Sequence, residues 1–137
     1  MYRVTETTCS TALHHHNSKW LPFKVDINVY RGCAHRCVYC YALYSHEYLG
    51  GGSFFDQIYA KTNIADVLRR ELPRFSRETV NLGGVTDSYQ PAERDCELMP
   101  GVLELLAQFG VPAVISTKSS LILRDMALLK EWRKRAG

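Results

Sequence analysis

Three short β-prone segments alternate with three helix-like segments along the chain. The first, "KVDINVYR" at 24–31, places apolar side chains at every second position, and "TVNLGGV" at 79–85 and "VPAVISTKSS" at 111–120 follow it. Strands that alternate with helices pair in parallel through right-handed crossovers. The sequence therefore predicts an α/β fold with three parallel βα units.

Each predicted helix carries apolar residues three and four positions apart. Asn63 is the expected N-cap of the first helix and Pro73 its expected stop, and Gly110 is expected just after the C-terminus of the second, within 97–110. The residues expected to face the core from the third helix, within 123–135, are Met126, Leu129 and Trp132.

Length and composition indicate a single globular domain. The chain has 137 residues, of which 46% are hydrophobic and 23% charged, and this is typical of folded proteins rather than disordered or fibrous ones. Residues 1–24 have no clear period and are predicted to form an irregular N-terminal arm before a domain over 25–137. No apolar run is long enough to span a bilayer and the polar start lacks the features of a signal peptide, so no membrane partner and a cytoplasmic location are expected.

The formal net charge of +3 is too small to identify a nucleic-acid partner. Such a partner is left open.

Three of the five cysteines lie within eight residues, in "CAHRCVYC" at 33–40. In a reducing cytosol such a cluster favours a metal site or catalysis over disulfides. Thiolates at Cys33, Cys37 and Cys40 can converge on one metal ion or cluster when the loop wraps around it.

Three kinds of metal site are consistent with these thiols. A structural zinc site needs a fourth ligand, for which His35, His46 and Cys96 are the candidates. A ferredoxin-type electron carrier would supply a fourth cysteine as well. The third interpretation is a 4Fe-4S cluster with three protein ligands and one iron left open for another molecule.

Every unusual segment follows the carboxyl end of a predicted strand. The cysteine loop follows the first strand, "GGVTDSYQP" at 83–91 the second, and "STKSS" at 116–120 the third. Because ligands of parallel α/β sheets bind beyond the carboxyl ends of the strands, these three segments are expected to face one pocket.

Three stretches between residues 27 and 129 resemble segments of a known family, in the same order. These are "NVYRGCAHRCVYCYA", "GVTDSYQPAER" and "ISTKSSLILRDMALL". They are similar to the spore photoproduct lyase-like (DNA repair photolyase-like) branch of the radical S-adenosylmethionine (radical SAM) superfamily. The resemblance implies the N-terminal half of a partial TIM-type (βα)6 barrel, with three of six units present in a truncated chain.

The resemblance also implies the cofactors. Cys33, Cys37 and Cys40 would ligate a 4Fe-4S cluster, and S-adenosyl-L-methionine would chelate the fourth iron. Reduction of the cluster by a flavodoxin- or ferredoxin-like electron donor would cleave S-adenosylmethionine to methionine and a 5′-deoxyadenosyl radical. The residues implied to contact the cofactor are Tyr39, Gly83, Gly84, Thr86, Asp87, Ser116, Thr117 and Lys118. No substrate and no catalytic residue acting on it are identified.

One position departs from the branch. Spore photoproduct lyases carry a cysteine hydrogen donor where this chain has Val85, and a valine cannot donate a hydrogen atom as a thiol does. Tyr89 is the nearest oxidisable side chain in the same loop. Membership of the branch therefore does not by itself imply thymine-dimer repair. The prediction is a radical SAM enzyme of unknown substrate, and its alternatives are a DNA photoproduct lyase or a non-catalytic module that binds zinc or a cluster.

Overall fold

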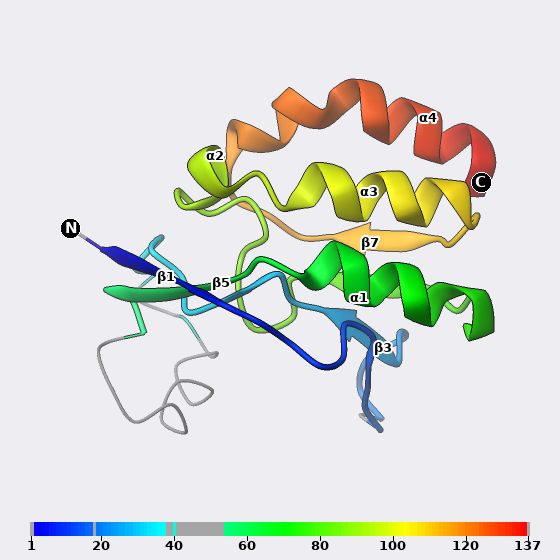
Figure 1. Ribbon diagram of the computed structural model, residues 1–137, viewed down its shortest axis with the longest axis horizontal. Helices are drawn as coiled ribbons and strands as arrows, with labels where there is room; N and C mark the ends of the chain where they lie inside the picture. The colour runs from blue at the N-terminus through cyan, green and yellow to red at the C-terminus, as the bar shows by residue number, and fades with distance from the viewer. Residues whose placement is uncertain (1, 18, 38–39, 41–53, 137) are drawn as a thin grey trace.

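The computed structural model describes residues 2–17, 19–37, 40 and 54–136, which form two small sheets and a layer of helices (Figure 1). The strand orders are β1-β5-β4 and β2-β3-β6-β7. The strands are β1 (Arg3–Thr7), β2 (His14–His15), β3 (Val25–Ile27), β4 (Tyr30–Arg31), β5 (Gln57–Lys61), β6 (Val80–Leu82) and β7 (Ala113–Ile115). The helices are α1 (Ile64–Glu71), α2 (Glu93–Cys96), α3 (Met99–Gln108) and α4 (Met126–Ala136), with 3-10 turns η2 (Leu72–Arg74) and η3 (Ser120–Asp125).

The three strands predicted from the sequence, β3, β6 and β7, pair in parallel. Val25 lies opposite Val80, and Val80 lies opposite Ala113. The predicted parallel pairing is therefore confirmed. Parallel strands end at the same edge of their sheet, so the loops that follow β3, β6 and β7 emerge together.

Helices α1, α3 and α4 lie side by side over the strands (Figure 1). Ile27 of β3 and Leu82 of β6 are fully buried beneath them, as are Leu68 of α1 and Leu106 of α3. Burying each such side chain stabilises the fold by about 1.5–3 kcal/mol. The apolar periodicity of the helices is therefore satisfied by packing against the sheet.

Helix α1 begins where the sequence predicts, with Asn63 at the N-cap position, but the Asn63 side chain does not cap the helix. The Asn63 side chain forms no bond to the first turn of the helix. Its Oδ1 accepts the backbone N–H of Cys9 at 2.8 Å and its Nδ2 donates to the Cys9 carbonyl at 2.9 Å. Asn63 therefore joins the N-terminal segment to α1, and Pro73 sits in the 3-10 turn that ends the helix.

The C-terminal end of α3 also follows the prediction. Gly110 adopts φ +63° immediately after the C-cap Phe109, a conformation that glycine reaches without steric cost.

One residue of α4 was predicted to face inward and does not. Trp132 is half-buried and donates its indole N–H to the Val111 carbonyl at 2.8 Å, whereas Met126 is 41% exposed. The chain runs through η3 before α4 begins, and the buried residue at that junction is Asp125. This turn rotates the start of α4 so that Met126 faces outward.

The prediction of an irregular arm over residues 1–24 was wrong in two places. β1 pairs in parallel with β5, with Arg3 opposite Gln57, and β2 pairs antiparallel with β3, with His14 opposite Asp26. β1 is largely exposed and shows no alternation of buried and exposed positions, so the sequence pattern that marks a half-buried strand is missing. Its partner β5, which the sequence analysis did not predict, supplies the hydrogen bonds.

Within the described part of the chain, no helix has both the length and the apolar character needed to cross a membrane.

Candidate functional site

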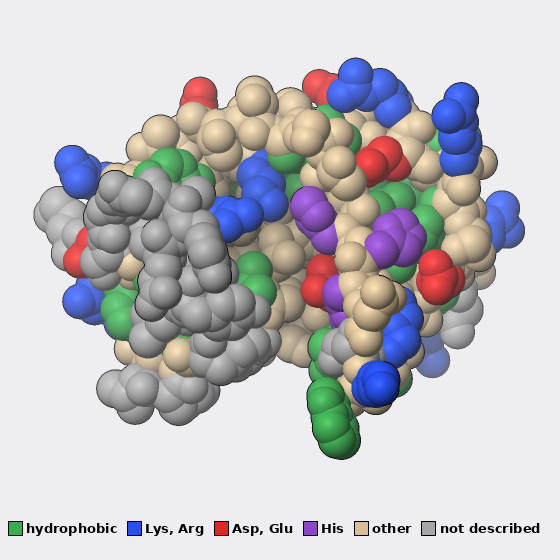
Figure 2. Space-filling model, turned by 90° about the horizontal axis from the view of Figure 1, so that it is seen from below, with side chains coloured by type: hydrophobic (Ala, Val, Ile, Leu, Met, Phe, Trp, Pro, Cys, Tyr) green, Lys and Arg blue, Asp and Glu red, His purple; other side chains and the backbone are tan. Residues whose placement is uncertain are grey.

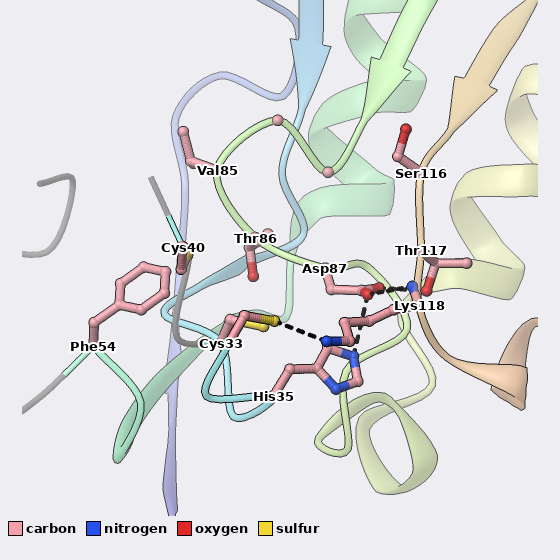
Figure 3. A pocket seen from close by; sticks show the side chains of 13 residues that line it. Cys33, His35, Cys40, Phe54, Val85, Thr86, Asp87, Ser116, Thr117 and Lys118 are labelled. Carbon is pink, nitrogen blue, oxygen red and sulfur yellow. Dashed lines mark hydrogen bonds and ion pairs between the residues drawn. The ribbon is translucent and has the colours of Figure 1, made fainter. Parts of the chain in front are cut away.

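A cavity of about 340 Å³ lies at the carboxyl ends of β3, β6 and β7. Figure 3 shows Cys40, Phe54 and Val85 on one side, Ser116 and Thr117 on the other, and Asp87 between them. Ten residues predicted from the sequence line this cavity: Cys33, Cys37, Cys40, Gly83, Gly84, Thr86, Asp87, Ser116, Thr117 and Lys118. Tyr39, the remaining predicted residue, lies outside the described residues.

The cysteine loop is held in place at its first residue. The Cys33 N–H donates to the Phe54 carbonyl at 3.0 Å, and Gly32 before it adopts φ +83°. A Cβ at Gly32 would lie 2.6 Å from the Gln57 carbonyl oxygen, so only glycine fits this close approach to β5. The Gly32 carbonyl in turn accepts the Thr86 hydroxyl at 2.6 Å, which ties the cysteine loop to the loop after β6.

Two of the three cysteines have polar groups directed at their sulfur atoms. Burial raises the pKa of the Cys33 thiol, and the backbone amides of His35 and Asp87, which hydrogen-bond to its sulfur, act in the opposite direction. The Lys118 ammonium donates to the Cys37 sulfur at 3.2 Å. Such N–H groups stabilise a thiolate, which is the form that binds metal.

The thiols line one cavity without being arranged around a single point. Among the residues that the structure describes, no three Cys, His, Asp or Glu side chains form a group close enough to hold a metal ion. The chemistry of the donor set, three thiols with N–H donors at two of them, nevertheless fits a thiolate-bound cluster or metal. Binding would require the loop to draw the sulfur atoms together.

The three candidates for a fourth zinc ligand lie in different places relative to the cavity. His35 lines the same cavity as the three cysteines. Cys96 lies in α2, where its thiol is hydrogen-bonded with Tyr30, and it does not line the cavity. His46 lies outside the described residues.

Asp87 joins the three loops that form the cavity. Its Oδ1 accepts the Tyr89 N–H at 2.8 Å and the Thr117 hydroxyl at 2.7 Å. Its Oδ2 accepts the Lys118 N–H at 3.1 Å and lies 3.1 Å from Nε2 of His35, without the angle of a hydrogen bond. Both carboxylate oxygens are thus already used by the protein, and Asp87 positions the loops.

Thr86 is engaged in the same way. Its hydroxyl donates to the Gly32 carbonyl and accepts from Nε2 of Gln90 at 2.9 Å, and the residue is buried. Gln90 also donates to the Gly32 carbonyl at 2.9 Å, and its Oε1 accepts the Ala34 N–H at 3.1 Å. Sequence reasoning missed Gln90, because the burial of a glutamine depends on a loop 58 residues away.

The two glycines after β6 are required by the turn itself. Gly83 adopts φ +92°, and a Cβ there would lie 2.8 Å from the Thr86 carbonyl oxygen. A Cβ at Gly84 would lie 3.0 Å from Oδ2 of Asp26. Packing within the chain therefore accounts for both glycines, whether or not a ligand approaches them.

Val85 and Tyr89 lie in different environments. Val85 lines the cavity and packs beside Cys33 and Phe54. Tyr89 is completely buried, its hydroxyl donates to Asp125 at 3.0 Å, and it does not line the cavity. The structure therefore places Tyr89 away from the position that a radical-quenching side chain would need.

Comparison with known proteins gives relatives without an assigned activity. No family model and no solved structure match the chain. It is 48% identical over 132 residues to the uncharacterized protein Rv2578c of Mycobacterium tuberculosis, covering 92% of this chain and 39% of that protein. It is 30% identical over 109 residues to the uncharacterized protein MJ0683 of Methanocaldococcus jannaschii, covering 80% of this chain and 40% of that protein. The chain thus spans about two fifths of the length of these relatives.

Proposed function

We propose that the chain is the cofactor-binding half of a radical SAM enzyme of the spore photoproduct lyase-like branch. In this proposal Cys33, Cys37 and Cys40 hold a 4Fe-4S cluster, and the remainder of the cavity receives S-adenosylmethionine. The substrate stays unassigned. The observation that carries the proposal is the meeting of the cysteine loop with the loops after β6 and β7 in one cavity.

When bound, the cluster and S-adenosylmethionine supply reductive cleavage of the sulfonium to methionine and a 5′-deoxyadenosyl radical. The chain's own residues provide the setting for that chemistry. The backbone amides of His35 and Asp87 are directed at the Cys33 sulfur, where they act against the burial that raises the pKa of this thiol. The Lys118 ammonium donates to the Cys37 sulfur. Asp87 fixes the loop after β7 relative to the loop after β6.

The opposite walls of the cavity differ in character. Phe54 and Val85 are apolar and flank the cysteines, whereas Ser116, Thr117 and Lys118 present hydroxyl groups and a cation. An apolar wall excludes water from a reactive site, and a polar wall suits an amino-acid carboxylate or a ribose. This asymmetry supports binding of a ligand that carries both kinds of group.

The half-barrel architecture is part of the proposal. β7 lies at the end of the strand order β2-β3-β6-β7, and its Val114 is 39% exposed. A further parallel strand could add to that edge, as in a six-unit barrel. A cytoplasmic location and a flavodoxin- or ferredoxin-like electron donor complete the proposal.

A structural zinc site is the second candidate, and His35 is the observation that favours it. This histidine lines the cavity with the three cysteines, so the residue types of a Cys3His zinc site occur around one cavity. A zinc site and a 4Fe-4S cluster differ in metal content and in colour, because zinc is colourless and the cluster absorbs broadly in the visible range.

The test uses the full-length protein, purified and reconstituted without oxygen and then reduced in the presence of S-adenosylmethionine. We expect iron and sulfide to bind and 5′-deoxyadenosine to form. Cys33→Ala, Cys37→Ala and Cys40→Ala should each abolish both. Cys9→Ala and Cys96→Ala are the matched controls, because neither thiol lines the cavity.

Stoichiometric zinc with no bound iron would replace the proposal with the zinc site. Full iron binding in any of the three triad variants would contradict the ligand assignment. An intact cluster that yields no 5′-deoxyadenosine would refute the radical chemistry and leave a cluster-binding module.

A further inference from the structure

A second cavity, of about 540 Å³, lies apart from the cysteine site and shares no lining residue with it. Its floor is the sheet formed by β1, β5 and β4. Thr7 of β1 lies opposite Lys61 of β5, and Arg31 of β4 lies opposite Tyr59 of β5. The segment 7–11 and His14 of β2 line the rest.

Lys61 is the central feature of this cavity. The residue is only 8% exposed, yet its side chain lines the cavity. Burial lowers the pKa of Lys61, and the neighbouring Arg31 guanidinium lowers it further. Within the described part of the chain, no carboxylate forms an ion pair with its ammonium group, and nothing hydrogen-bonds to that group.

An ammonium group at the end of a largely buried side chain is costly without a counter-ion, and a second cation beside it raises the cost. Arg31 lines the same cavity, and His14 stands at its exposed rim. The pKa of His14 is lowered by partial burial of its ring and by the charge of Lys61. An anion bound between Lys61 and Arg31 would remove the repulsion between them.

The remaining lining groups indicate which anion. The segment 7–11 reads Thr-Thr-Cys-Ser-Thr and supplies several hydroxyl groups, and Tyr59 adds a phenol. A carboxylate has two oxygens to satisfy, whereas a phosphate group has three or four and takes many donors. Figure 2 shows histidines close together on one face of the molecule, with Lys, Arg, Asp and Glu side chains around them.

We propose that this cavity is a binding site for a phosphate group, held between Lys61 and Arg31 and by the hydroxyl groups of segment 7–11. The cavity is larger than a free phosphate ion, so the rest of a small phosphorylated molecule fits beside it. The site is independent of the proposed cluster chemistry, because the two cavities have no residue in common.

The test is isothermal titration calorimetry of the full-length protein with potassium phosphate near neutral pH, against potassium chloride at equal ionic strength. We expect saturable phosphate binding and none with chloride. Lys61→Met should weaken binding by about tenfold or more, the value of one charge-assisted hydrogen bond. Lys130→Met, which removes an exposed lysine of α4, should leave it unchanged.

Lys61→Met should fold, because a methionine fills similar space without a buried charge. Its thermal unfolding without phosphate should occur at or above the wild-type temperature, whereas a lysine with a purely structural role would leave the variant less stable. Arg31→Met, the second variant, should weaken phosphate binding as well.

Titrations with ribose 5-phosphate and with ribose show whether the site binds a phosphorylated metabolite or the free phosphate ion. Tighter binding of the ester than of inorganic phosphate would assign a phosphorylated metabolite, and equal affinities would assign the free ion. Absence of phosphate binding by the wild-type protein, or equal affinity in Lys61→Met, would overturn the proposal. Phosphate binding is measured on protein without a bound cluster, so each result is independent of the radical SAM assignment.

Discussion

The ammonium group of Lys118 lies 3.2 Å from the sulfur of Cys37, although the two residues are 81 positions apart in the chain. The loop after β7 brings the lysine there, and two bonds to Asp87 hold that loop, one from the Thr117 hydroxyl and one from the Lys118 N–H. A cation at this distance stabilises a thiolate. The contact therefore links the segment "STKSS" at 116–120 directly to the cysteine loop.

Removing this cation should make Cys37 less reactive. We expect Lys118→Met to slow alkylation of Cys37 by iodoacetamide about threefold to tenfold in the metal-free protein, because the substitution removes the cation that donates to the Cys37 sulfur. Peptide mass spectrometry after timed quenching measures the rate. Cys40 in the same sample is the internal control, since no lysine contact to it occurs among the described residues. An unchanged rate at Cys37 would show that the contact does not affect the reactivity of its sulfur.

The loops around the cavity are supported by a carboxylate that is completely buried. Glu93 accepts the Tyr30 hydroxyl at 2.6 Å and the Leu98 N–H at 2.9 Å, and Nη2 of Arg124 donates to it at 2.6 Å. These bonds join β4, α2 and η3. Arg124 also pairs with Asp125, and its bonds to Asp125 and Glu93 raise the pKa of the guanidinium. Asp125 also accepts the Tyr89 hydroxyl.

Neutralising Glu93 should therefore destabilise the protein strongly. We expect Glu93→Gln to lower the free energy of unfolding by roughly 3 kcal/mol, because it leaves the Arg124 charge without one of its two buried partners. Urea unfolding followed by circular dichroism measures the loss. Glu131→Gln is the matched control: it breaks an exposed pair with Arg135, and the expected change is about 0.5 kcal/mol or less. Equal effects of the two substitutions would contradict the role assigned to Glu93.

The turn after β6 gives a third prediction. Gly83→Ala should destabilise the protein by about 1–3 kcal/mol, because φ +92° is strained for alanine and the added Cβ would lie 2.8 Å from a backbone oxygen. Gly101→Ala is the control within α3. There the new Cβ meets only the Ala65 Cβ at 3.4 Å, and loss of helical glycine should stabilise by roughly 0.5–1 kcal/mol. Thermal unfolding of both variants measures the difference, and a destabilised Gly101→Ala beside a neutral Gly83→Ala would reverse the argument.

Local patterns explain which parts of this structure were predictable. The apolar spacing of α1 and α3 and the alternation around Val25 report burial directly, and parallel pairing follows from the order of strands and helices. Parallel pairing in turn predicts that the three loops meet, which is why ten predicted residues line one cavity. These inferences need only neighbouring residues and one rule of topology.

The remainder depends on partners far away in the chain. β1 is an exposed strand without a sequence pattern of its own, and it forms by pairing with β5, more than 50 residues later in the chain. Glu93 resembles an ordinary helix-start residue until Arg124, 31 positions on, meets it in the core. Asp87 and Thr86 line the cavity as predicted, and their oxygens also hydrogen-bond with Thr117 and Gly32. No local pattern distinguishes a polar side chain that binds a ligand from one that joins two loops.

Two buried tyrosines predict how stability changes at alkaline pH. Burial raises the pKa of Tyr30 well above its ordinary value of 10.0, and its hydrogen bond to the Glu93 carboxylate adds to the shift. Burial also raises the pKa of Tyr89, together with the charge of Asp125. Both hydroxyls therefore stay protonated in the folded protein at a pH where the unfolded chain has lost these protons. A raised folded pKa contributes stability that is complete below pH 10 and is lost as the pH rises further.

We expect the free energy of unfolding to fall above about pH 10, by about 1.4 kcal/mol per pH unit for each of these tyrosines. Near neutral pH, Tyr30→Phe and Tyr89→Phe should each be less stable than the wild-type protein, because each loses a hydrogen bond to a buried carboxylate. Above pH 10 the difference should shrink, since phenylalanine has no proton to lose on unfolding. Urea unfolding at about pH 7, 9 and 11 measures both trends. A difference between wild type and variant that stays constant with pH would show that neither hydroxyl is held protonated by the fold, whereas convergence at the alkaline end confirms the buried network around Glu93 and Asp125.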